Sequence, residues 1–429
     1  MTHIVAREHD LLVRGAKPAG SGPSVHGVPP DAFDELRKFM QTPVEGNKGQ
    51  TEVLARSTLH GQQHALRLRQ WVGVICTPQG TTLEILPKTH EPEHLQDGVT
   101  ASRTMLFKML AAGGNNYRAA LPADLNAAGM PLFEVVLRYA LEVLKKAIQH
   151  GLPHTYQEIL EERLGLKGRL NIPQQVKQPH HRMHLLHVKY DEFLPDRPET
   201  RLARLAVERI ARLTRRNDSK RLARELLQAL EHVSPSRQVK QDFQSVKLER
   251  GYRHFAPALD VSKLVLYELN PLTAGGQSRA TAVLFDMNRV YETYVAHLLR
   301  SQFPEWEVKT QVTGKALGKV LDKSVFRLRP DLLITAPEGV IVADTKWKRL
   351  DPDQIPAYGI LNADAYQMLA YSEVFQKDQS TKTLWLIYPS VSGLPEHLPP
   401  MKLTGERTLR VVCLDLLKDP PVFTGIHEG

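Results

Sequence analysis

The sequence contains little cysteine, since Cys76 and Cys413 are the only two cysteines in 429 residues. Two cysteines exclude a disulfide framework and a cysteine-rich zinc cluster, and a reducing compartment is the simplest environment for them. No run of about 18 apolar residues is present, which excludes a membrane-spanning helix. The first ten residues lack the apolar segment of a signal peptide. We therefore expect a cytoplasmic protein.

The sequence also lacks the P-loop pattern G-x-x-x-x-G-K-S/T, the phosphate-binding loop of many nucleotide hydrolases. We therefore expect this chain to bind no nucleotide, so a nucleotide-driven step would require another subunit. Acidic residues are outnumbered, because 56 Lys and Arg against 47 Asp and Glu leave a formal net charge of +9. This charge favours a polyanionic partner such as DNA but does not identify one.

The length and the 42% content of hydrophobic residues are sufficient for two or three domains with substantial cores. We predict an α+β multidomain protein with three parts. A small β-rich N-terminal domain covers residues 1–98, where short strand-like segments are separated by glycine turns. A mostly helical middle region covers 99–275, because apolar residues recur there at helical spacing. The C-terminal domain, 276–429, is expected to contain a mixed sheet flanked by helices.

Two apolar segments in the C-terminal domain predict an antiparallel hairpin. Residues 325–335 and 340–347 are rich in Val, Ile, Leu and Phe, as strands are. Between them, Ala336-Pro337-Glu338-Gly339 is a typical turn sequence. The densest set of candidate catalytic groups in the chain lies near the far end of this hairpin: Asp331, Asp344 and Lys346.

The register of the hairpin decides where Asp331 lies. Side chains alternate along a strand, so Asp344 and Lys346 share one face of the sheet. A two-residue loop at Pro337 and Glu338 places Asp331 opposite Asp344, with Cβ atoms about 5 Å apart. A three-residue loop shifts the register by one, and Asp331 then needs a bulge or a strand end to reach the same place. The sequence leaves both registers open.

Two converging carboxylates repel each other and lose hydration unless a cation lies between them. Oxygen ligands of this kind suit Mg²⁺, or Mn²⁺. Such a metal lowers the pKa of a bound water and polarises a phosphoryl oxygen, while Lys346 is placed to orient the water or stabilise the pentavalent phosphate. The pattern therefore predicts phosphodiester hydrolysis, with Asp331 and Asp344 as metal ligands.

Pro330-Asp331 followed by Asp344-Thr345-Lys346 resembles the signature of the PD-(D/E)xK nuclease superfamily. The resemblance implies an α/β nuclease domain in which Asp331 and Asp344 hold the metal and Lys346 is the catalytic lysine. A helix predicted over 284–299 carries Glu292, and this superfamily often has a further acidic group in such a helix. Without the resemblance, Glu292 would be interpreted as a solvated helix residue.

Gln367 and Tyr371 lie four residues apart, on one face of a predicted helix. This spacing is similar to the Gln-x-x-x-Tyr element of RecB-like nucleases, so Gln367 becomes a secondary catalytic candidate and Tyr371 a candidate DNA contact. The alternative interpretation is a surface amide and a tyrosine at the edge of the core.

A longer set of segments, in the same order along the chain, resembles the McrC family, the endonuclease subunits of McrBC modification-dependent restriction systems. The segments are LEILPK from residue 83, LKGRL from 166, Asn270-Pro271 with Gly275, FDMNRVYETYV from 285, RPDLLI from 329, VADTKWK from 342 and DAYQMLAY from 364. The resemblance implies cleavage of modified (5-methylcytosine) double-stranded DNA, licensed by a separate McrB-like AAA+ GTPase ring. It also implies that residues 1–98 bind this partner. Since a double-strand break needs two cuts, pairing of two nuclease domains is expected.

The strongest basic cluster of the chain lies within residues 201–224. Its members are Arg201, Arg204, Arg209, Arg212, Arg215, Arg216, Lys220, Arg221 and Arg224. They would suit a DNA backbone, yet a solvated helix face balanced by Glu208, Asp218 and Glu225 explains them equally. Four histidines within 180–187 do not have the spacing of a zinc site, and a polar loop or a phosphate contact is expected.

Two other functions stay open. A free-standing RecB-like repair nuclease fits the spacing of Gln367 and Tyr371, and it would be active without a partner or a nucleotide. A non-catalytic activator or assembly subunit of the GTPase would keep the fold but is expected to lose metal ligands. Both aspartates and the lysine are present, which argues against the second alternative.

Overall fold

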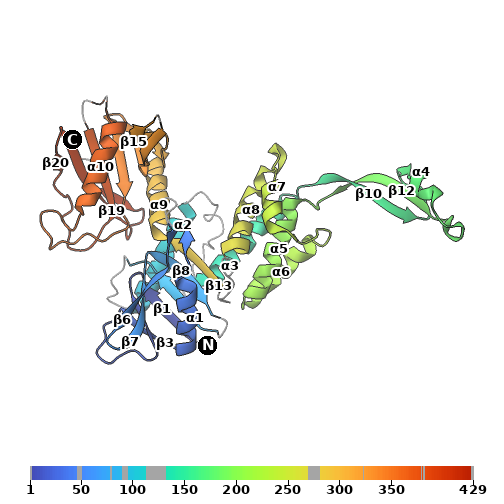
Figure 1. Ribbon diagram of the computed structural model, residues 1–429, viewed down its shortest axis with the longest axis horizontal. Coiled ribbons are helices and arrows are strands. Elements are labelled where there is room, and N and C mark those ends of the chain that lie inside the picture. Colours follow the sequence, from blue (N-terminus) through green and yellow to red (C-terminus); the bar gives the residue numbers. More distant parts are fainter. Residues whose placement is uncertain are drawn as a thin grey trace. The chain divides into compact units, whose positions relative to one another are not determined.

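The computed structural model describes residues 2–45, 51–77, 80–88, 95–112, 132–268, 281–321, 323–377, 379 and 382–426. The chain divides into two compact units. Unit 1 combines Met1–Leu132 with Pro271–Gly429, and unit 2 is the intervening Phe133–Asn270 (Figure 1). In the described ranges, no helix combines the length and the apolar character that crossing a bilayer requires.

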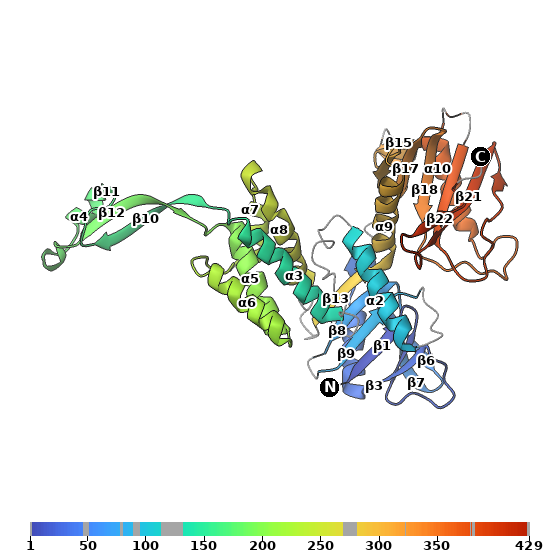
Figure 2. The same cartoon turned by 180° about the vertical axis from the view of Figure 1, so that it is seen from behind.

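The C-terminal part of unit 1 is built on a mixed sheet, as expected (Figure 2). Its strands follow the order β14-β17-β18-β19-β21, and β20 and β22 both pair with β21. β14, β17 and β18 are antiparallel neighbours, whereas β18, β19 and β21 are parallel. The strands are β14 (Glu307–Thr310), β17 (Leu332–Ala336), β18 (Gly339–Thr345), β19 (Lys382–Pro389), β20 (Met401–Leu403), β21 (Arg407–Asp415) and β22 (Val422–Thr424).

Helices α9 (Met287–Gln302) and α10 (Asn362–Phe375) cover this sheet. α10 connects β18 to β19 and packs in one apolar cluster with Val342 and Leu384. Trp385 follows Leu384 and therefore points to the opposite face. There its ring centroid lies 5.9 Å from that of Trp306, which follows α9. The expected sheet flanked by helices is therefore present.

The β17–β18 hairpin has the two-residue loop. Leu332 pairs with Ala343 and Ala336 pairs with Gly339, so Pro337 and Glu338 form the loop. Continuing this register by one residue brings Asp331 opposite Asp344. Of the two registers left open by the sequence, the structure adopts the one that brings the two carboxylates together.

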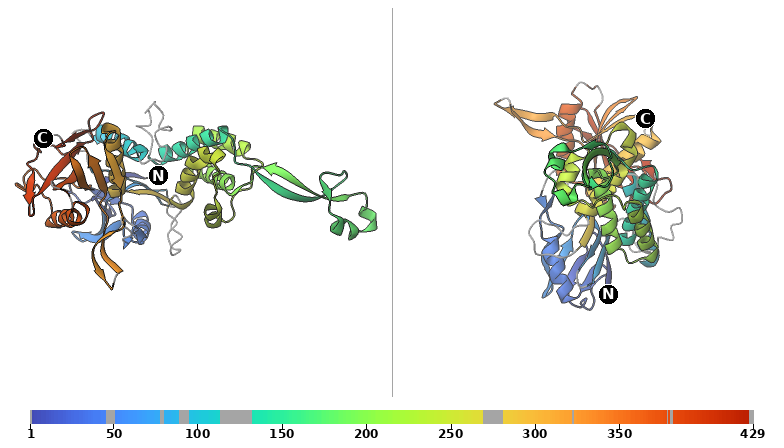
Figure 3. Two further views of the ribbon diagram at one scale, coloured as in Figure 1. Left: turned by 90° about the horizontal axis from the view of Figure 1, so that it is seen from above. Right: turned by 90° about the vertical axis from the view of Figure 1, so that its right-hand side faces the viewer.

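The expected first strand of the hairpin, 325–335, is not continuous. Residues up to Leu328 belong to β16 (Lys323–Leu328), which pairs with β15 (Lys315–Val320) and not with the mixed sheet. β17 begins only at Leu332. The break falls at Arg329-Pro330-Asp331, and Pro330 has no N–H to donate to a continuing ladder. The β15–β16 ribbon extends away from the sheet, in orange in Figure 3.

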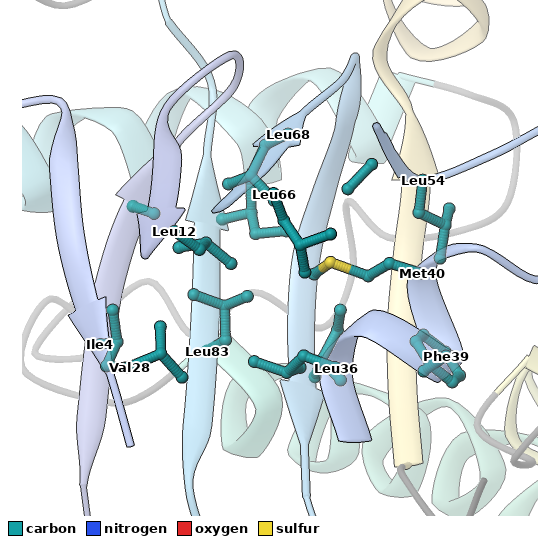
Figure 4. Close-up of a cluster of buried hydrophobic side chains, with 14 of the residues drawn as sticks. Ile4, Leu12, Val28, Leu36, Phe39, Met40, Leu54, Leu66, Leu68 and Leu83 are labelled. Atoms are coloured by element: carbon teal, nitrogen blue, oxygen red, sulfur yellow. The ribbon is translucent and has the colours of Figure 1, made fainter. Parts of the chain in front are cut away.

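The N-terminal part of unit 1 contains two four-stranded sheets and the short pair of β4 (Val44–Glu45) with β5 (Thr51–Glu52). One has the order β1-β9-β8-β13, and the other β3-β2-β7-β6. The strands are β1 (His3–Arg7), β2 (Leu11–Arg14), β3 (Val25–Val28), β6 (Ala55–His60), β7 (Gln63–Leu68), β8 (Trp71–Cys76), β9 (Thr82–Leu86) and β13 (Thr281–Asp286). Helix α1 (Pro30–Met40) inserts Leu36 and Met40 into the core that these sheets share with Leu12, Leu66 and Leu83 (Figure 4).

Helix α2 (Leu95–Ala112) contacts β9 and α9, so it links the two parts of unit 1. Arg103 of α2 forms a buried ion pair with Glu84 of β9, with Nε and Oε1 2.6 Å apart. Glu84 lies in the LEILPK segment, and burial of its carboxylate is balanced by this arginine.

Unit 2 contains the helices α3 (Leu132–Gln149), α5 (Pro198–Leu213), α6 (Asn217–Ala229), α7 (Val239–Ser245) and α8 (Ala256–Lys263). The middle region was expected to be mostly helical, and the structure adds a sheet that was not predicted. β10 (Thr155–Arg163) and β12 (Leu186–Leu194) form a long antiparallel pair, and β11 (Arg169–Leu170) joins β12.

Strand β13 comes directly before α9 in the sequence but pairs with β8 of the N-terminal sheet. The two strands approach closely at Gly73, whose φ is +138°. A Cβ atom at this position would lie 1.9 Å from the carbonyl oxygen of Val283, so only glycine fits.

Replacing Gly73 with alanine should therefore force β8 and β13 apart and destabilise unit 1 by about 1–3 kcal/mol. We expect a lower thermal unfolding midpoint for Gly73→Ala by circular dichroism. The matched control is Gly22→Ala, because a Cβ atom there meets no atom within 4 Å. Equal midpoints for the two variants would show that the close approach at Gly73 is not required.

Candidate active site

Asp331 and Asp344 meet where β17 begins and β18 ends. Both are buried, with 4% and 1% of their surface exposed. The Oδ2 atom of Asp331 accepts hydrogen bonds from the Thr345 backbone nitrogen and the Thr345 hydroxyl, each at 2.9 Å. These bonds fix the Asp331 carboxylate against the strand that carries Asp344. The structure therefore brings the two predicted metal ligands to one place.

Lys346 lies between two carboxylates. Its Nζ atom is 2.7 Å from Asp344 Oδ2 and 3.3 Å from Asp364 Oδ1. Burial lowers the pKa of Lys346, but the two carboxylates outweigh it and raise the pKa above the usual lysine value. The backbone nitrogen of Lys346 donates to Ile387 of β19 at 2.9 Å, which fixes the main chain. Lys346 is therefore a half-buried cation held by two carboxylates.

Gln367 and Tyr371 of α10 connect Lys346 to the segment before Asp331. The Oε1 atom of Gln367 accepts from Lys346 Nζ at 2.9 Å, and its Nε2 atom donates to the Tyr371 hydroxyl at 2.8 Å. Tyr371 in turn donates to the carbonyl oxygen of Arg329 at 3.0 Å. Gln367 Nε2 also lies 3.5 Å from Asp344 Oδ1. Tyr371 is buried, so its expected role as a DNA contact stays a prediction.

Glu292 is buried on α9 and not solvated, with 5% of its surface exposed. It accepts a hydrogen bond from the side chain of Gln311. The backbone nitrogen of Gln311 donates to the carbonyl oxygen of Asp331 at 2.9 Å. Glu292 is thus linked to the site through Gln311, while its catalytic role stays a prediction.

Asp364 was missed by the sequence interpretation. Its second oxygen, Oδ2, lies 3.1 Å from Lys348 Nζ, so it bridges two lysines. Burial raises the pKa of Asp364, but Lys346 and Lys348 lower it below its usual value. The helical spacing places Asp364 on the same face as Gln367 and Tyr371, which follow it by three and seven residues. This spacing would have allowed Asp364 to be predicted from the sequence.

The donor set fits a hard divalent cation. Asp331 and Asp344 provide carboxylate oxygens, and Mg²⁺ is usually held by one or two carboxylates with waters completing its octahedron. Among the described residues, no group of three or more His, Cys, Asp or Glu side chains is arranged as a metal cluster. The chemistry of the site therefore matches a two-carboxylate magnesium site and not a cage of protein ligands.

Trp347, which follows Lys346, is held by the N-terminal sheet. Its indole Nε1 donates to Glu8 at 2.8 Å (Oε2) and 3.1 Å (Oε1), and its carbonyl oxygen accepts from Lys88 Nζ at 2.9 Å. Glu8 follows β1 and Lys88 follows β9, and these strands are parallel neighbours whose ends lie together. Lys88 is the last residue of the LEILPK segment. No sequence signal pointed to this contact across 339 positions.

The basic cluster of unit 2 is largely engaged within the chain. Arg201 pairs with Asp196 (Nε to Oδ1, 2.8 Å), and Arg204 donates to the carbonyl oxygens of Leu230 and Glu231. The acidic partners expected for a solvated face are present in three pairs: Arg204–Glu208 at 3.2 Å, Arg216–Asp218 at 3.0 Å and Arg221–Glu225 at 3.1 Å. DNA binding by Arg201, Arg204, Arg212, Arg215 and Arg216 stays a prediction. His180, His181 and His184 lie in an exposed polar segment, as expected.

Comparison with known proteins identifies a matching protein family. Residues 66–389 match a family model described as McrBC 5-methylcytosine restriction system component. The chain is similar in structure to a half-complex from Thermococcus gammatolerans, described as coming from a tetradecameric assembly of McrB AAA+ hexamers with bound McrC. The TM-score is 0.66 at 17% identity, over 96% of this chain and 95% of that chain.

A cryo-EM structure of the Thermococcus gammatolerans McrBC complex is also similar, with a TM-score of 0.49 and 20% identity. That match covers 70% of this chain and 87% of the other. No curated protein matches the sequence. At these identities the structural likeness shows the fold, a mixed α+β arrangement of several sheets and helices.

The contact at Trp347 predicts a pH dependence of stability. Burial raises the pKa of Glu8 from 4.5 to about 7, so the folded chain binds this proton more tightly than the unfolded chain. The contribution of Glu8 to stability is therefore greatest below pH 4.5 and decreases as the pH rises to about 7. The full decrease corresponds to about 3 kcal/mol.

We expect Glu8→Gln to remove this decrease. Between pH 5 and pH 8 the wild-type free energy of unfolding should fall by about 2–3 kcal/mol more than that of Glu8→Gln, measured by urea titration. Exposed Glu396, replaced by glutamine, is the control and should leave the wild-type pH dependence unchanged. Parallel pH profiles for wild type and Glu8→Gln would contradict the raised pKa.

Proposed function

The chain belongs to the family of McrBC 5-methylcytosine restriction system components, and from this premise we propose that it is the DNA endonuclease subunit of such a system. It hydrolyses phosphodiester bonds in modified double-stranded DNA, with Mg²⁺ or Mn²⁺ as cofactor. The proposal is carried by the convergence of Asp331, Asp344, Lys346 and Gln367 at one end of the β17–β18 hairpin. These residues match the PD-(D/E)xK pattern, and their convergence supports the proposal.

Asp331 and Asp344 hold the metal ion in this proposal. When bound, the metal supplies Lewis-acid polarisation of a phosphoryl oxygen and a water of lowered pKa. The Asp331 carboxylate is oriented for this role by the two hydrogen bonds from Thr345. Asp344 is oriented by Lys346 and by the amide of Gln367. Both carboxylates are therefore held in position before DNA binds.

Lys346 acts as a cation and not as a general base, because its raised pKa keeps it protonated at neutral pH. Its ammonium group donates a hydrogen bond to the attacking water or stabilises the negative charge that develops on the phosphate. Gln367 is a positioning residue, since its carbonyl oxygen holds the ammonium group and its amide is held by Tyr371. Glu292 acts through Gln311 on the main chain of Asp331.

The partner in this proposal is an McrB-like AAA+ GTPase ring, since the related Thermococcus gammatolerans assembly is described as McrB hexamers with bound McrC. The ring supplies the nucleotide hydrolysis that this chain has no P-loop to perform. A cytoplasmic location and the pairing of two nuclease domains for double-strand cleavage stay predictions.

The sequence assigned the partner contact to residues 1–98, but unit 2 offers a more distinctive surface. The β10–β12 ribbon and the segment at its tip expose large apolar side chains. They are Leu160 (61% exposed), Leu164 (77%), Leu166 (65%), Ile172 (64%), Val176 (79%) and Met183 (62%). An exposed apolar surface of this kind is typical of a protein interface. We therefore place the contact with the ring on this ribbon.

The LKGRL segment is part of that surface, which gives the segment a structural role. Gly168 has a φ of +70°, and a Cβ atom there would lie 2.5 Å from Cβ of Tyr190 on β12. Only glycine allows the chain to turn this close to β12 and return as β11. The turn presents Leu166 to solvent at the tip of the ribbon.

Cleavage of methylated plasmid DNA tests the proposed reaction. With Mg²⁺, GTP and an McrB-like partner, the wild-type chain should cut methylated plasmid and leave unmethylated plasmid intact. Asp344→Asn should reduce cutting at least 100-fold, because it removes the charge that holds the metal. It should also abolish binding of Mn²⁺ measured by electron paramagnetic resonance.

The control for this experiment is Asp353→Asn, an exposed aspartate whose loss should change neither reading. Cutting by the chain alone, without partner or GTP, would favour a free-standing repair nuclease. A chain that stimulates GTP hydrolysis by the ring but never cuts DNA would favour the activator subunit.

Introducing a negative charge into the apolar surface tests the partner contact. Leu166→Asp should weaken binding of the McrB-like ring at least tenfold in surface plasmon resonance, because burial of the new carboxylate would be unfavourable. The matched variant is Leu59→Asp, which changes an equally exposed leucine (63%) on β6 of the N-terminal domain. Loss of binding by Leu59→Asp alone would instead assign the contact to residues 1–98.

A further inference from the structure

The β15–β16 ribbon has no assigned role in the reaction described above. Its strands pair from Lys315 with Leu328 to Val320 with Lys323. Within the described residues this ribbon forms a sheet of its own, and almost all of its side chains are exposed or half-buried. In both views of Figure 3 it extends away from the rest of unit 1. Of the paired residues only Leu328 at the base is buried, so the side chains nearer the tip are available to a ligand.

The exposed side chains of the ribbon are of two kinds. Large apolar groups lie at and near its tip: Leu317 (49% exposed), Val320 (58%), Leu321 (92%) and Phe326 (75%). Basic groups are distributed along both strands: Lys315, Lys319, Lys323 and Arg327. Asp322 is the one acidic residue of the sequence between 315 and 328. The ligand is therefore anionic and has apolar surface as well.

The basic side chains lie on both faces of the ribbon. Residues paired across two strands share a face, and faces alternate along each strand. Lys323 pairs with Val320 and Arg327 with Ala316, so these two basic residues share one face. Lys319, one position from Val320, lies on the other face together with Lys315. Each face thus carries two cations, which suits a ligand with negative charge on two opposing walls.

The base of the ribbon is fixed to the candidate active site. Lys315 Nζ donates to the carbonyl oxygen of Val374 on α10 at 3.1 Å and lies 4.7 Å from the ring centroid of Phe375. Leu328 is buried in the nuclease core. Only Arg329 and Pro330 separate Leu328 from Asp331. A ligand bound along this ribbon is therefore held next to the first residue of β17, where the two carboxylates meet.

We propose that the β15–β16 ribbon is a DNA-binding element that enters the major groove tip first and positions the duplex at the Asp331–Asp344 site. The proposal rests on the nuclease function proposed above. A ribbon with side chains on both faces is about 10 Å thick. It matches the major groove, which is about 12 Å wide and admits a two-stranded ribbon, and exceeds the minor groove of about 6 Å.

The two kinds of side chain then have distinct roles. Lys319 and Lys323, on opposite faces, contact the phosphates of the two groove walls. Leu321 and Phe326 contact base edges and thymine methyl groups on the groove floor. Each strand spans about 20 Å, enough to reach the floor from the nuclease surface. A second copy of this chain is a poorer ligand, because a protein of net charge +9 would oppose four further cations.

The experiment measures binding of the full chain, assembled with its ring partner, to a fluorescent 30-base-pair duplex by anisotropy. EDTA prevents cleavage. The double variant Lys319→Gln/Lys323→Gln should weaken binding at least tenfold and reduce the slope of log K against log salt by about 2. Leu321→Ala/Phe326→Ala should also weaken binding but leave this slope unchanged, because it removes no phosphate contact.

The matched control is Lys17→Gln/Lys38→Gln, which removes two exposed lysines of the N-terminal domain that have no assigned role. It should bind as the wild type does. Wild-type affinity in Lys319→Gln/Lys323→Gln overturns the proposal, and so does a loss confined to the Lys17→Gln/Lys38→Gln variant. A change in oligomeric state without a change in DNA affinity would instead assign the ribbon to a second copy of the chain.

The two proposals fail in distinguishable ways. Asp344→Asn leaves the ribbon intact, so its duplex binding should still depend on Lys319 and Lys323 while it no longer cuts. If the wild type binds through the ribbon but never cuts, the nuclease function fails and DNA binding stands. If the wild type cuts and the ribbon variants bind and cut normally, the ribbon proposal fails and the nuclease function stands.

Discussion

The hydrogen bond between the Trp347 indole and the buried Glu8 carboxylate joins the two parts of unit 1. Lys88 binds the carbonyl oxygen of the same tryptophan, so both its side chain and its main chain are held from the N-terminal sheet. On the other side, the Trp347 ring packs on Tyr291 at 5.1 Å between centroids, next to Glu292 on α9. Lys346 immediately precedes Trp347, so the position of the candidate catalytic lysine depends on a domain that lies outside the mixed sheet. A conformational change in the N-terminal domain that moves Glu8 or Lys88 would therefore also move Trp347 and Lys346.

Charge is partly balanced within the site itself. Asp344 and Asp364 face the ammonium groups of Lys346 and Lys348, which offset their two charges, and the Asp331 carboxylate leaves one negative charge over. Burying Asp344 or Asp364 alone would cost on the order of several kcal/mol, whereas the two lysines compensate these carboxylates. The same compensation explains why the pKa of Lys346 is raised although the residue is half-buried. For Glu8 the effect of burial is the larger one. It outweighs the hydrogen bonds that Glu8 accepts and raises the pKa of Glu8 to about 7.

The candidate site was largely predictable because its signals are local. The turn residues Pro337 and Gly339 and the alternation of Asp344 with Lys346 follow from short-range geometry. The register of the hairpin and the strand break at Pro330 could be read only from the structure, because apolar residues continue on both sides of the break. Asp364 was detectable from its helix face. The pairing of Glu8 with Trp347 was not, because no local pattern relates residues at opposite ends of the chain.

The β10–β12 ribbon escaped prediction, and of the β15–β16 ribbon only residues 325–328 were expected to form a strand, as part of the hairpin. Both misses have a common physical reason. A strand is recognised by alternation of apolar and polar residues, and this alternation arises only when one face is buried. In these ribbons both faces are largely exposed, so the selection that produces the pattern is missing. A two-stranded ribbon is marginally stable by itself in water. The apolar groups that these ribbons expose would be covered only by a ligand, and this is the physical basis of both binding proposals.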